Sequence, residues 1–221
     1  VSRESVHIAL TTAALNDLPI CACDIQNAYL QAKSTEKHYI ICGPEFGEEN
    51  VGMRALIRQA HYRGKSAGSD YWQHVRDAMW EMKFRPCLAD SDVWMRLGEK
   101  NNGLQVWNYV LLYTDYILAI MEEPEQFLKD TFASFFTFKP TSIGPPTQYL
   151  GNKVSKVTME GGQSTWAFSS SQYVQNVVNN VNERLKKQGE RLPVRSKSPW
   201  PSNYRPESDV TPPLGPTESS Y

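Results

Sequence analysis

Two aspartates stand where a carboxylate could take part in chemistry. Asp24 lies near the end of the short apolar run 20–25, and Asp115 lies in the polar stretch between the apolar runs 105–112 and 117–121. Burying most of a strand while leaving one acid at its tip is costly unless that acid has a partner or a cation. Two such acids on neighbouring strands would repel each other, and a divalent metal would relieve the repulsion. An isolated aspartate at a strand end, however, is more often a turn residue.

A metal held by these two acids would suit one kind of reaction. Mg²⁺ prefers a few carboxylates together with substrate phosphates. In two-metal phosphoryl transfer, a carboxylate cluster holds one ion at the attacking hydroxyl group and another at the leaving group. Such a site would require Asp24 and Asp115 to lie close together at the tip of a hairpin.

The elements that must position these acids are predicted from hydrophobic periodicity and turn signals. Helices are predicted over residues 4–15, 70–83, 125–136 and 171–187, and strands over residues 20–25, 39–42, 93–97, 105–112, 117–121, 149–157 and 165–168. The second and third helices are expected to bury Trp72, Val75, Met79 and Met82, and Phe127, Leu128, Phe132 and Phe135. Residues 52–69, rich in glycine and basic side chains, are predicted to be a loop with a helical start. Hairpins dominate, which favours an α+β fold over a doubly wound parallel sheet.

Composition limits the class of protein. The chain has 221 residues and a net charge of −1, which counts against broad nucleic-acid binding, because neutralising phosphates needs clustered Lys and Arg. One such cluster lies near the C-terminus: Arg184, Lys186, Lys187, Arg191, Arg195 and Lys197. The four cysteines have no zinc-site spacing and predict reduced thiols in an intracellular protein. We expect no membrane span, since no apolar run is long enough.

The segments around the two acids are more specific than their spacing. Residues 23–30 (CDIQNAYL) place an Asp, four residues, an aromatic and a Leu in order, and residues 113–117 (YTDYI) form a Tyr-x-Asp hairpin. Further short segments follow the same order along the chain: 43–47 (GPEFG), 89–94 (ADSDVW), 149–151 (YLG) and 169–174 (SSSQYV). Together, over roughly residues 1–187, they resemble the reverse transcriptases of Ty1/copia-type retrotransposons.

The resemblance implies a fold and partners. Residues 1–187 would form a polymerase palm-like domain, a ferredoxin-like antiparallel sheet packed on helices, with partial fingers. Residues 188–221, which are rich in proline, would be an extended linker toward an RNase H region. The activity would be RNA-directed DNA polymerisation on an RNA or DNA template-primer with dNTP. The chain would be a fragment of a Pol polyprotein working in a cytoplasmic virus-like particle, with the basic fingers motifs before Val1 and RNase H after Tyr221.

The resemblance also implies a metal site. Asp24 would bind both ions, Mg²⁺ or Mn²⁺, with the carbonyl group of Ile25 as a further ligand, and Asp115 would be the second carboxylate. The family has another Asp directly after the one in the hairpin, but this chain has Tyr116. A phenol is uncharged at neutral pH and cannot replace a carboxylate beside Mg²⁺. We therefore expect the polymerase activity to be impaired.

Three further residues would contact the nucleotide or template. Tyr29 would lie under the incoming sugar and exclude a 2′-hydroxyl group, although a core tyrosine is the other interpretation. Lys65 and Gly68 would belong to the segment that contacts template and nucleotide. In that segment Arg63 stands where the family has Gly, and we predict that it prevents the backbone conformation used there.

Two other interpretations stay open. The chain could be a non-catalytic remnant that binds nucleic acid or a protein through its basic region 184–197, although a solvated helix end explains the same charges. It could also be a ferredoxin-like binding module, unrelated to polymerases, in which the short matching segments are incidental.

Overall fold

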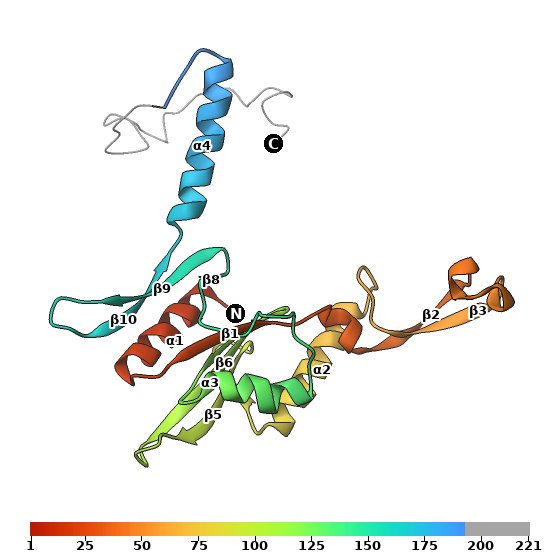
Figure 1. Ribbon diagram of the computed structural model, residues 1–221, viewed down its shortest axis with the longest axis horizontal. Helices are drawn as coiled ribbons and strands as arrows, with labels where there is room; N and C mark the ends of the chain where they lie inside the picture. The colour runs from red at the N-terminus through yellow and green to blue at the C-terminus, as the bar shows by residue number, and fades with distance from the viewer. Residues whose placement is uncertain (193–221) are drawn as a thin grey trace, which may run out of the picture. The chain divides into compact units, whose positions relative to one another are not determined.

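The computed structural model describes residues 1–192, which form a mixed α+β fold with antiparallel sheets (Figure 1). The α+β class predicted from the sequence is therefore confirmed. The chain divides into two units between Tyr173 and Val174, and each unit is described by itself. The predicted linker 188–221 lies, beyond Leu192, outside the described residues.

Helices and strands alternate irregularly along the chain. The helices are α1 (Arg3–Leu15), α2 (Ala67–Glu81), α3 (Pro124–Gln126) and α4 (Ser171–Lys187), with short helical turns η1 (Ala28–Gln31), η2 (Pro44–Phe46), η3 (Glu48–Asn50), η4 (Phe127–Thr131) and η5 (Phe132–Ser134). The strands are β1 (Ile20–Asp24), β2 (Lys33–Ile41), β3 (Arg54–Gln59), β4 (Arg85–Pro86), β5 (Val93–Glu99), β6 (Gln105–Tyr113), β7 (Tyr116–Ile120), β8 (Gln148–Tyr149), β9 (Asn152–Thr158) and β10 (Ser164–Ser169). Each predicted helix and strand overlaps an observed one.

A five-stranded antiparallel sheet in the order β1-β7-β6-β5-β4 forms the centre of the first unit. Successive residues of a strand point to opposite faces of a sheet. In β7, Ile117 and Ala119 join one core cluster, whereas Leu118 and Ile120 join another. Because both faces are buried, β7 has a continuous apolar sequence rather than an alternating one.

Helices cover both faces of this sheet (Figure 1). Buried side chains of α2 and of the segment from α3 to η5 share one cluster with Ile25 of the chain after β1 and Trp94 of β5. Buried side chains of α1 share the other cluster with Tyr149 of β8 and Val154 of β9. The sheet therefore lies between α2 and the α3–η5 segment on one face and α1 with β8 and β9 on the other.

The buried face of α2 differs from the predicted one by one residue. Val75, Met79 and Met82 are buried as expected, but Trp72 is 43% exposed and Tyr71 fills the inner position. Neighbouring residues of a helix are about 100° apart around its axis. Tyr71 and Trp72 therefore flank the stripe of Val75, Met79 and Met82 on its two sides, and the fold buries Tyr71.

The third predicted helix is broken into α3, a π-helical stretch η4 and a 3-10 turn η5. Phe127, Leu128 and Phe132 are buried as expected. Phe135 is only partly buried, and Phe136 takes the inner position instead. The changes in helical winding account for this shift, because they rotate later side chains away from a regular 3.6-residue stripe.

The prediction of a loop over residues 52–69 is wrong for its first half. Residues Arg54–Gln59 form β3, which pairs antiparallel with β2, and β2 begins at Lys33 rather than at residue 39. The residues of this hairpin are exposed or half-buried, and none is fully buried. Because basic side chains take exposed positions and neither face is buried, the sequence gives only a weak alternation, which is why the strand was missed.

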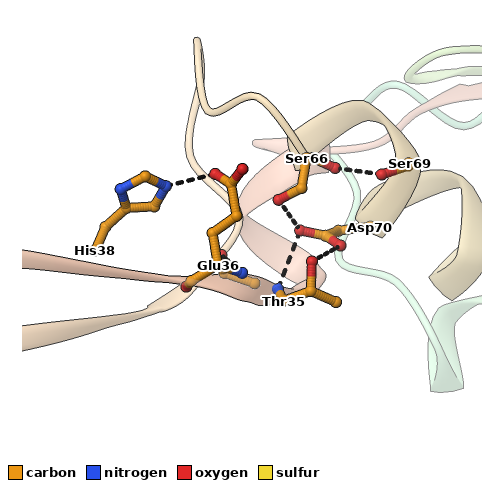
Figure 2. A network of polar contacts seen from close by, with 7 residues as sticks. Thr35, Glu36, His38, Ser66, Ser69 and Asp70 are labelled. Carbon is orange, nitrogen blue, oxygen red and sulfur yellow. Dashed lines mark hydrogen bonds and ion pairs between the residues drawn. The ribbon is translucent and has the colours of Figure 1, made fainter.

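A buried carboxylate fastens the β2–β3 hairpin to α2 (Figure 2). Asp70, in the first turn of α2, accepts hydrogen bonds from Ser66 Oγ at 2.7 Å, Thr35 Oγ1 at 2.8 Å and the Thr35 N–H at 3.2 Å. On the neighbouring part of β2, Glu36 pairs with His38. A buried acid needs such donors to offset its lost hydration. This Asp70 network, made of Thr35, Ser66 and Asp70, therefore fixes the hairpin relative to the helix.

The end of α2 carries a lysine at a position where glycine is usual. Lys83 has φ +67°, and its N–H donates to Trp80 O at 3.0 Å while the Phe84 N–H donates to Met79 O at 2.9 Å. These two bonds form a Schellman motif, whose left-handed residue is usually glycine. A side chain in this conformation costs about 1 kcal/mol, partly offset by the greater freedom of glycine when unfolded. We expect Lys83→Gly to raise the free energy of unfolding by about 0.5–1 kcal/mol in urea unfolding.

An exposed position inside the same helix supplies the matched control. Gln73→Gly is expected to lower the free energy of unfolding by about 0.5–1 kcal/mol, because glycine weakens a helix interior. If both glycine variants lost stability, the left-handed residue at position 83 would not be a source of strain.

Candidate active site

The tips of β1 and of the β6–β7 hairpin bring the two predicted aspartates together. Asp24 is the last residue of β1 and is paired with Tyr116, the first residue of β7. Asp115 precedes Tyr116, and its carbonyl oxygen accepts a hydrogen bond from the Ile25 N–H at 2.7 Å. Lys139 Nζ lies 2.6 Å from Asp24 Oδ1 and 3.9 Å from Asp115 Oδ2. The predicted proximity of the acids is confirmed, and their catalytic role stays a prediction.

The turn that carries Asp115 is strained. Tyr113 and Tyr116 are paired, so Thr114 and Asp115 form a two-residue turn. Thr114 has φ +53°, in a region that a β-branched residue rarely adopts. Its carbonyl oxygen accepts a hydrogen bond from the hydroxyl group of Tyr71 at 2.8 Å. Strain of this kind persists only where the surroundings impose it, and here α2 and the sheet together hold Asp115 in one position.

Residues 137–144, which we name the crossing segment, run along the outer side of β1. The Lys139 N–H donates to Asp24 O at 2.8 Å, and Gly144 and Ala22 exchange two hydrogen bonds of 2.7 and 3.0 Å. The Lys139 ammonium is half-exposed, and its pKa is raised, first by its close contact with the carboxylate of Asp24 and also by the charge of Asp115. The crossing segment thus places the positive charge of Lys139 beside the carboxylates of Asp24 and Asp115.

Tyr116 occupies the position at which the resembling family has its second aspartate. Its hydroxyl group donates to Gln148 O at 2.8 Å, and its ring packs against Tyr149 with 5.3 Å between centroids. Burial, and then the charge of Asp24, raises the pKa of Tyr116. The phenol therefore stays neutral at physiological pH, and its oxygen is engaged away from the carboxylates.

As they stand, these residues do not fit a two-metal centre. Among residues 1–192, no group of three or more His, Cys, Asp and Glu side chains is arranged to hold a metal ion. Asp24 and Asp115 are half-buried, and the positive charge of Lys139 already lies against both. A divalent cation would have to displace this ammonium, because like charges repel at such distances. The role of the Ile25 carbonyl as a ligand stays a prediction.

A cavity lies beside the turn that carries Asp115. Its volume is about 260 Å³, and its lining includes Tyr29, Gly68, Tyr71 and Thr114. Tyr29 is half-buried and packs edge-on against Tyr71, with 5.4 Å between ring centroids. The structure therefore brings two of the three predicted nucleotide-contacting residues, Tyr29 and Gly68, to one cavity that is lined by Thr114, the residue before Asp115. Because Tyr29 contacts both the cavity and the core, its two interpretations stay open.

The segment before α2 departs from what its sequence predicted. Lys65 is exposed and is not among the residues that line the cavity. Arg63 has φ +73°, so the arginine itself lies in the left-handed region, and the prediction that it prevents the family's backbone conformation stays a prediction. The chain adopts the left-handed conformation at a cost of about 1–2 kcal/mol, which a glycine would avoid.

Two residues that complete the site were missed by sequence reasoning. Lys139 has no local motif, because its partners Asp24 and Asp115 are far away along the chain. Tyr71 was missed because Trp72 was assigned to the buried face of the helix instead. The apolar spacing of Tyr71 with Val75 was the available signal.

The predicted basic cluster begins in the last turn of α4, in the second unit. Arg184, Lys186 and Lys187 lie there, whereas Arg195 and Lys197 are outside the described residues. Basic side chains at a helix C-terminus interact favourably with the helix dipole. Arg191 lies after the helix, and the interpretation of this cluster as a solvated helix end stays a prediction.

No protein-family model matches the chain, and no curated protein or solved structure is detectably similar to it. The resemblance to reverse transcriptases therefore rests on the order of the short sequence segments. None of the helices within residues 1–192 is both long and apolar enough to cross a membrane.

Proposed function

We propose that this chain is, by descent, the palm core of a Ty1/copia-type reverse transcriptase, an RNA-directed DNA polymerase that uses two-metal nucleotidyl transfer. The observation that carries the proposal is the meeting of Asp24 and Asp115 at the tips of β1 and of the β6–β7 hairpin. An antiparallel sheet covered by helices supports a palm-like identity. The strained turn and the cavity beside it support the same proposal.

The proposal assigns partners to the remaining residues. The sugar of a dNTP would lie at Tyr29, and the template-primer would lie near Lys65 and Gly68. Mg²⁺ or Mn²⁺ would be the cofactor of the intact centre, at Asp24 and Asp115. Its partners would include the other regions of a Pol polyprotein. Its location would be a cytoplasmic virus-like particle.

A second candidate function, a palm-like remnant that binds nucleic acid or protein without catalysis, is favoured by the state of the acid pair. Tyr116 supplies no carboxylate, and Lys139 lies against both acids. Loss of several kcal/mol of transition-state stabilisation slows a reaction on the order of a thousandfold. We therefore propose that the wild-type chain has the architecture of the polymerase and has lost most of its activity.

Restoring the missing carboxylate tests the proposed function. Tyr116→Asp is expected to raise Mg²⁺- or Mn²⁺-dependent primer extension at least on the order of tenfold over the wild type, because it adds a metal ligand. The measurement is the incorporation of labelled dNTP into an annealed template-primer. Adding Asp24→Asn to Tyr116→Asp is expected to abolish the gain.

Tyr39 supplies the matched control, since it is an exposed tyrosine on β2 that does not line the cavity. Tyr39→Asp adds the same charge away from the acid pair and is expected to leave extension unchanged. A folded Tyr116→Asp protein that incorporates no more dNTP than Tyr39→Asp would overturn the proposal that position 116 limits the activity.

A further inference from the structure

We propose that Lys139 is a built-in cation that takes the place of a divalent metal between Asp24 and Asp115, so that this pair excludes such metals while the ammonium is present. The inference rests on the proposed function in one respect only, which is the choice of a divalent metal as the competing ligand. It assigns to Lys139 a role that the sequence did not reveal.

The contacts show one positive charge shared by two acids. Lys139 Nζ lies 2.6 Å from Asp24 Oδ1 and 3.9 Å from Asp115 Oδ2. Asp24 Oδ1 is buried, so the ammonium lies against the carboxylate oxygen that has lost its water. Two converging carboxylates would repel each other, and a cation between them removes most of that repulsion. A divalent metal would need the same oxygens.

The backbone that carries Lys139 is anchored to Asp24 itself. The Lys139 N–H donates to Asp24 O at 2.8 Å, and the Asp24 N–H donates to Ser142 Oγ at 3.1 Å. The Ser142 N–H in turn donates to Lys139 O at 3.1 Å. The lysine side chain therefore starts from a fixed point beside the acids. This distinguishes it from a surface lysine that meets a carboxylate only in passing.

An ordinary surface ion pair is the competing explanation, because Lys139 is 49% exposed and such pairs contribute little to stability. Two observations favour the built-in cation. The ammonium contacts two carboxylates rather than one, and the crossing segment fixes the backbone at both Lys139 and Gly144. Metal binding separates the two explanations, since only a competing cation changes the metal affinity.

The test is Mn²⁺ binding, measured by calorimetry and by the loss of the free Mn²⁺ electron-spin-resonance signal. Lys139→Gln is expected to bind Mn²⁺ at least on the order of tenfold more tightly than the wild type. Lys139→Arg, which keeps the charge, is expected to bind as weakly as the wild type. Lys139→Gln combined with Asp24→Asn is expected to lose the added affinity.

Lys129→Gln is the matched control, because Lys129 forms a comparable 2.6 Å ion pair with Glu125 on the surface. It is expected to leave Mn²⁺ binding unchanged. Equal Mn²⁺ affinity of Lys139→Gln and Lys139→Arg would overturn the inference. So would tight Mn²⁺ binding by the wild type that Asp24→Asn abolishes, and this second measurement does not depend on any Lys139 variant folding. Because no primer or nucleotide is used, failure here is distinct from failure of the proposed polymerase.

Discussion

The protein in which Asp70 is replaced by Asn is expected to unfold at a temperature roughly 5 °C or more below that of the wild type at pH 7. Asp70 is 7% exposed and accepts three hydrogen bonds from Ser66 and Thr35. An amide has one oxygen and a donor NH₂ group, so it cannot accept all three bonds. Thermal unfolding followed by circular dichroism measures the loss.

This loss of stability is expected to depend on pH. The hydrogen bond from Ser66, followed by those from Thr35, lowers the pKa of Asp70 below its ordinary value of 3.8, against an opposing effect of burial. The unfolded chain therefore binds this proton more readily, and the free energy of unfolding rises with pH. The contribution is fully present above the ordinary pKa and disappears as the pH falls through the lower folded-state pKa. The difference between wild type and Asp70→Asn should thus shrink below about pH 4.

Asp77 provides the control for this prediction. It is an exposed carboxylate on the same helix, and its Oδ1 accepts a hydrogen bond from Gln73 Nε2 at 2.7 Å. Asp77→Asn is expected to change the unfolding temperature by no more than about 1–2 °C. If the Asp70→Asn and Asp77→Asn proteins unfolded at the same temperature at pH 7, the Asp70 network would not fasten the hairpin.

Removing the buried hydroxyl group of Tyr149 is expected to stabilise the protein, whereas removing that of Tyr71 is expected to destabilise it. Tyr149 is 1% exposed, and its hydroxyl group has no hydrogen-bond partner within residues 1–192. An unpaired buried polar group costs about 1–3 kcal/mol. Tyr149→Phe keeps the ring against Tyr116 and is expected to raise the free energy of unfolding by about 1–2 kcal/mol. Urea unfolding measures the change.

Tyr71 is the matched residue for comparison. It is 5% exposed, and its hydroxyl group donates to Thr114 O at 2.8 Å. Tyr71→Phe removes this bond and leaves the carbonyl oxygen without its partner, so we expect a loss of about 1–2 kcal/mol. A loss of stability in both variants would show that Tyr149 has a partner in solution.

Much of the fold could be predicted, because its elements carry local signals. Ser2 precedes α1, and its Oγ accepts a hydrogen bond from the Ser5 N–H as an N-cap should. Residues 101–103 (NNG), a sequence that favours a hairpin turn, lie between β5 and β6. Asp24 and Asp115 could be recognised from the sequence because each lies at the end of an apolar run, and the end of a strand can be predicted from local sequence.

What could not be predicted depends on contacts between distant parts of the chain. The strand β3 was missed because its stability comes from pairing with β2 rather than from its own apolar pattern. Asp70 was placed near a helix N-terminus, but nothing in the sequence joined it to Thr35. For the same reason, the meeting of Asp24 and Asp115 was expected, whereas the neutralising Lys139 was not.

The crossing segment also affects how the protein behaves among other copies of itself. The outermost strand of a sheet has free N–H and C=O groups that can pair with another chain and start aggregation. On one side of the five-stranded sheet, the crossing segment occupies such groups of β1 through the bridge between Ala22 and Gly144. On the other side, β4 is only Arg85–Pro86, and proline has no N–H to offer. In the described part of the chain, each side of this sheet is thus partly occupied, which reduces the free N–H and C=O groups available for edge-to-edge association.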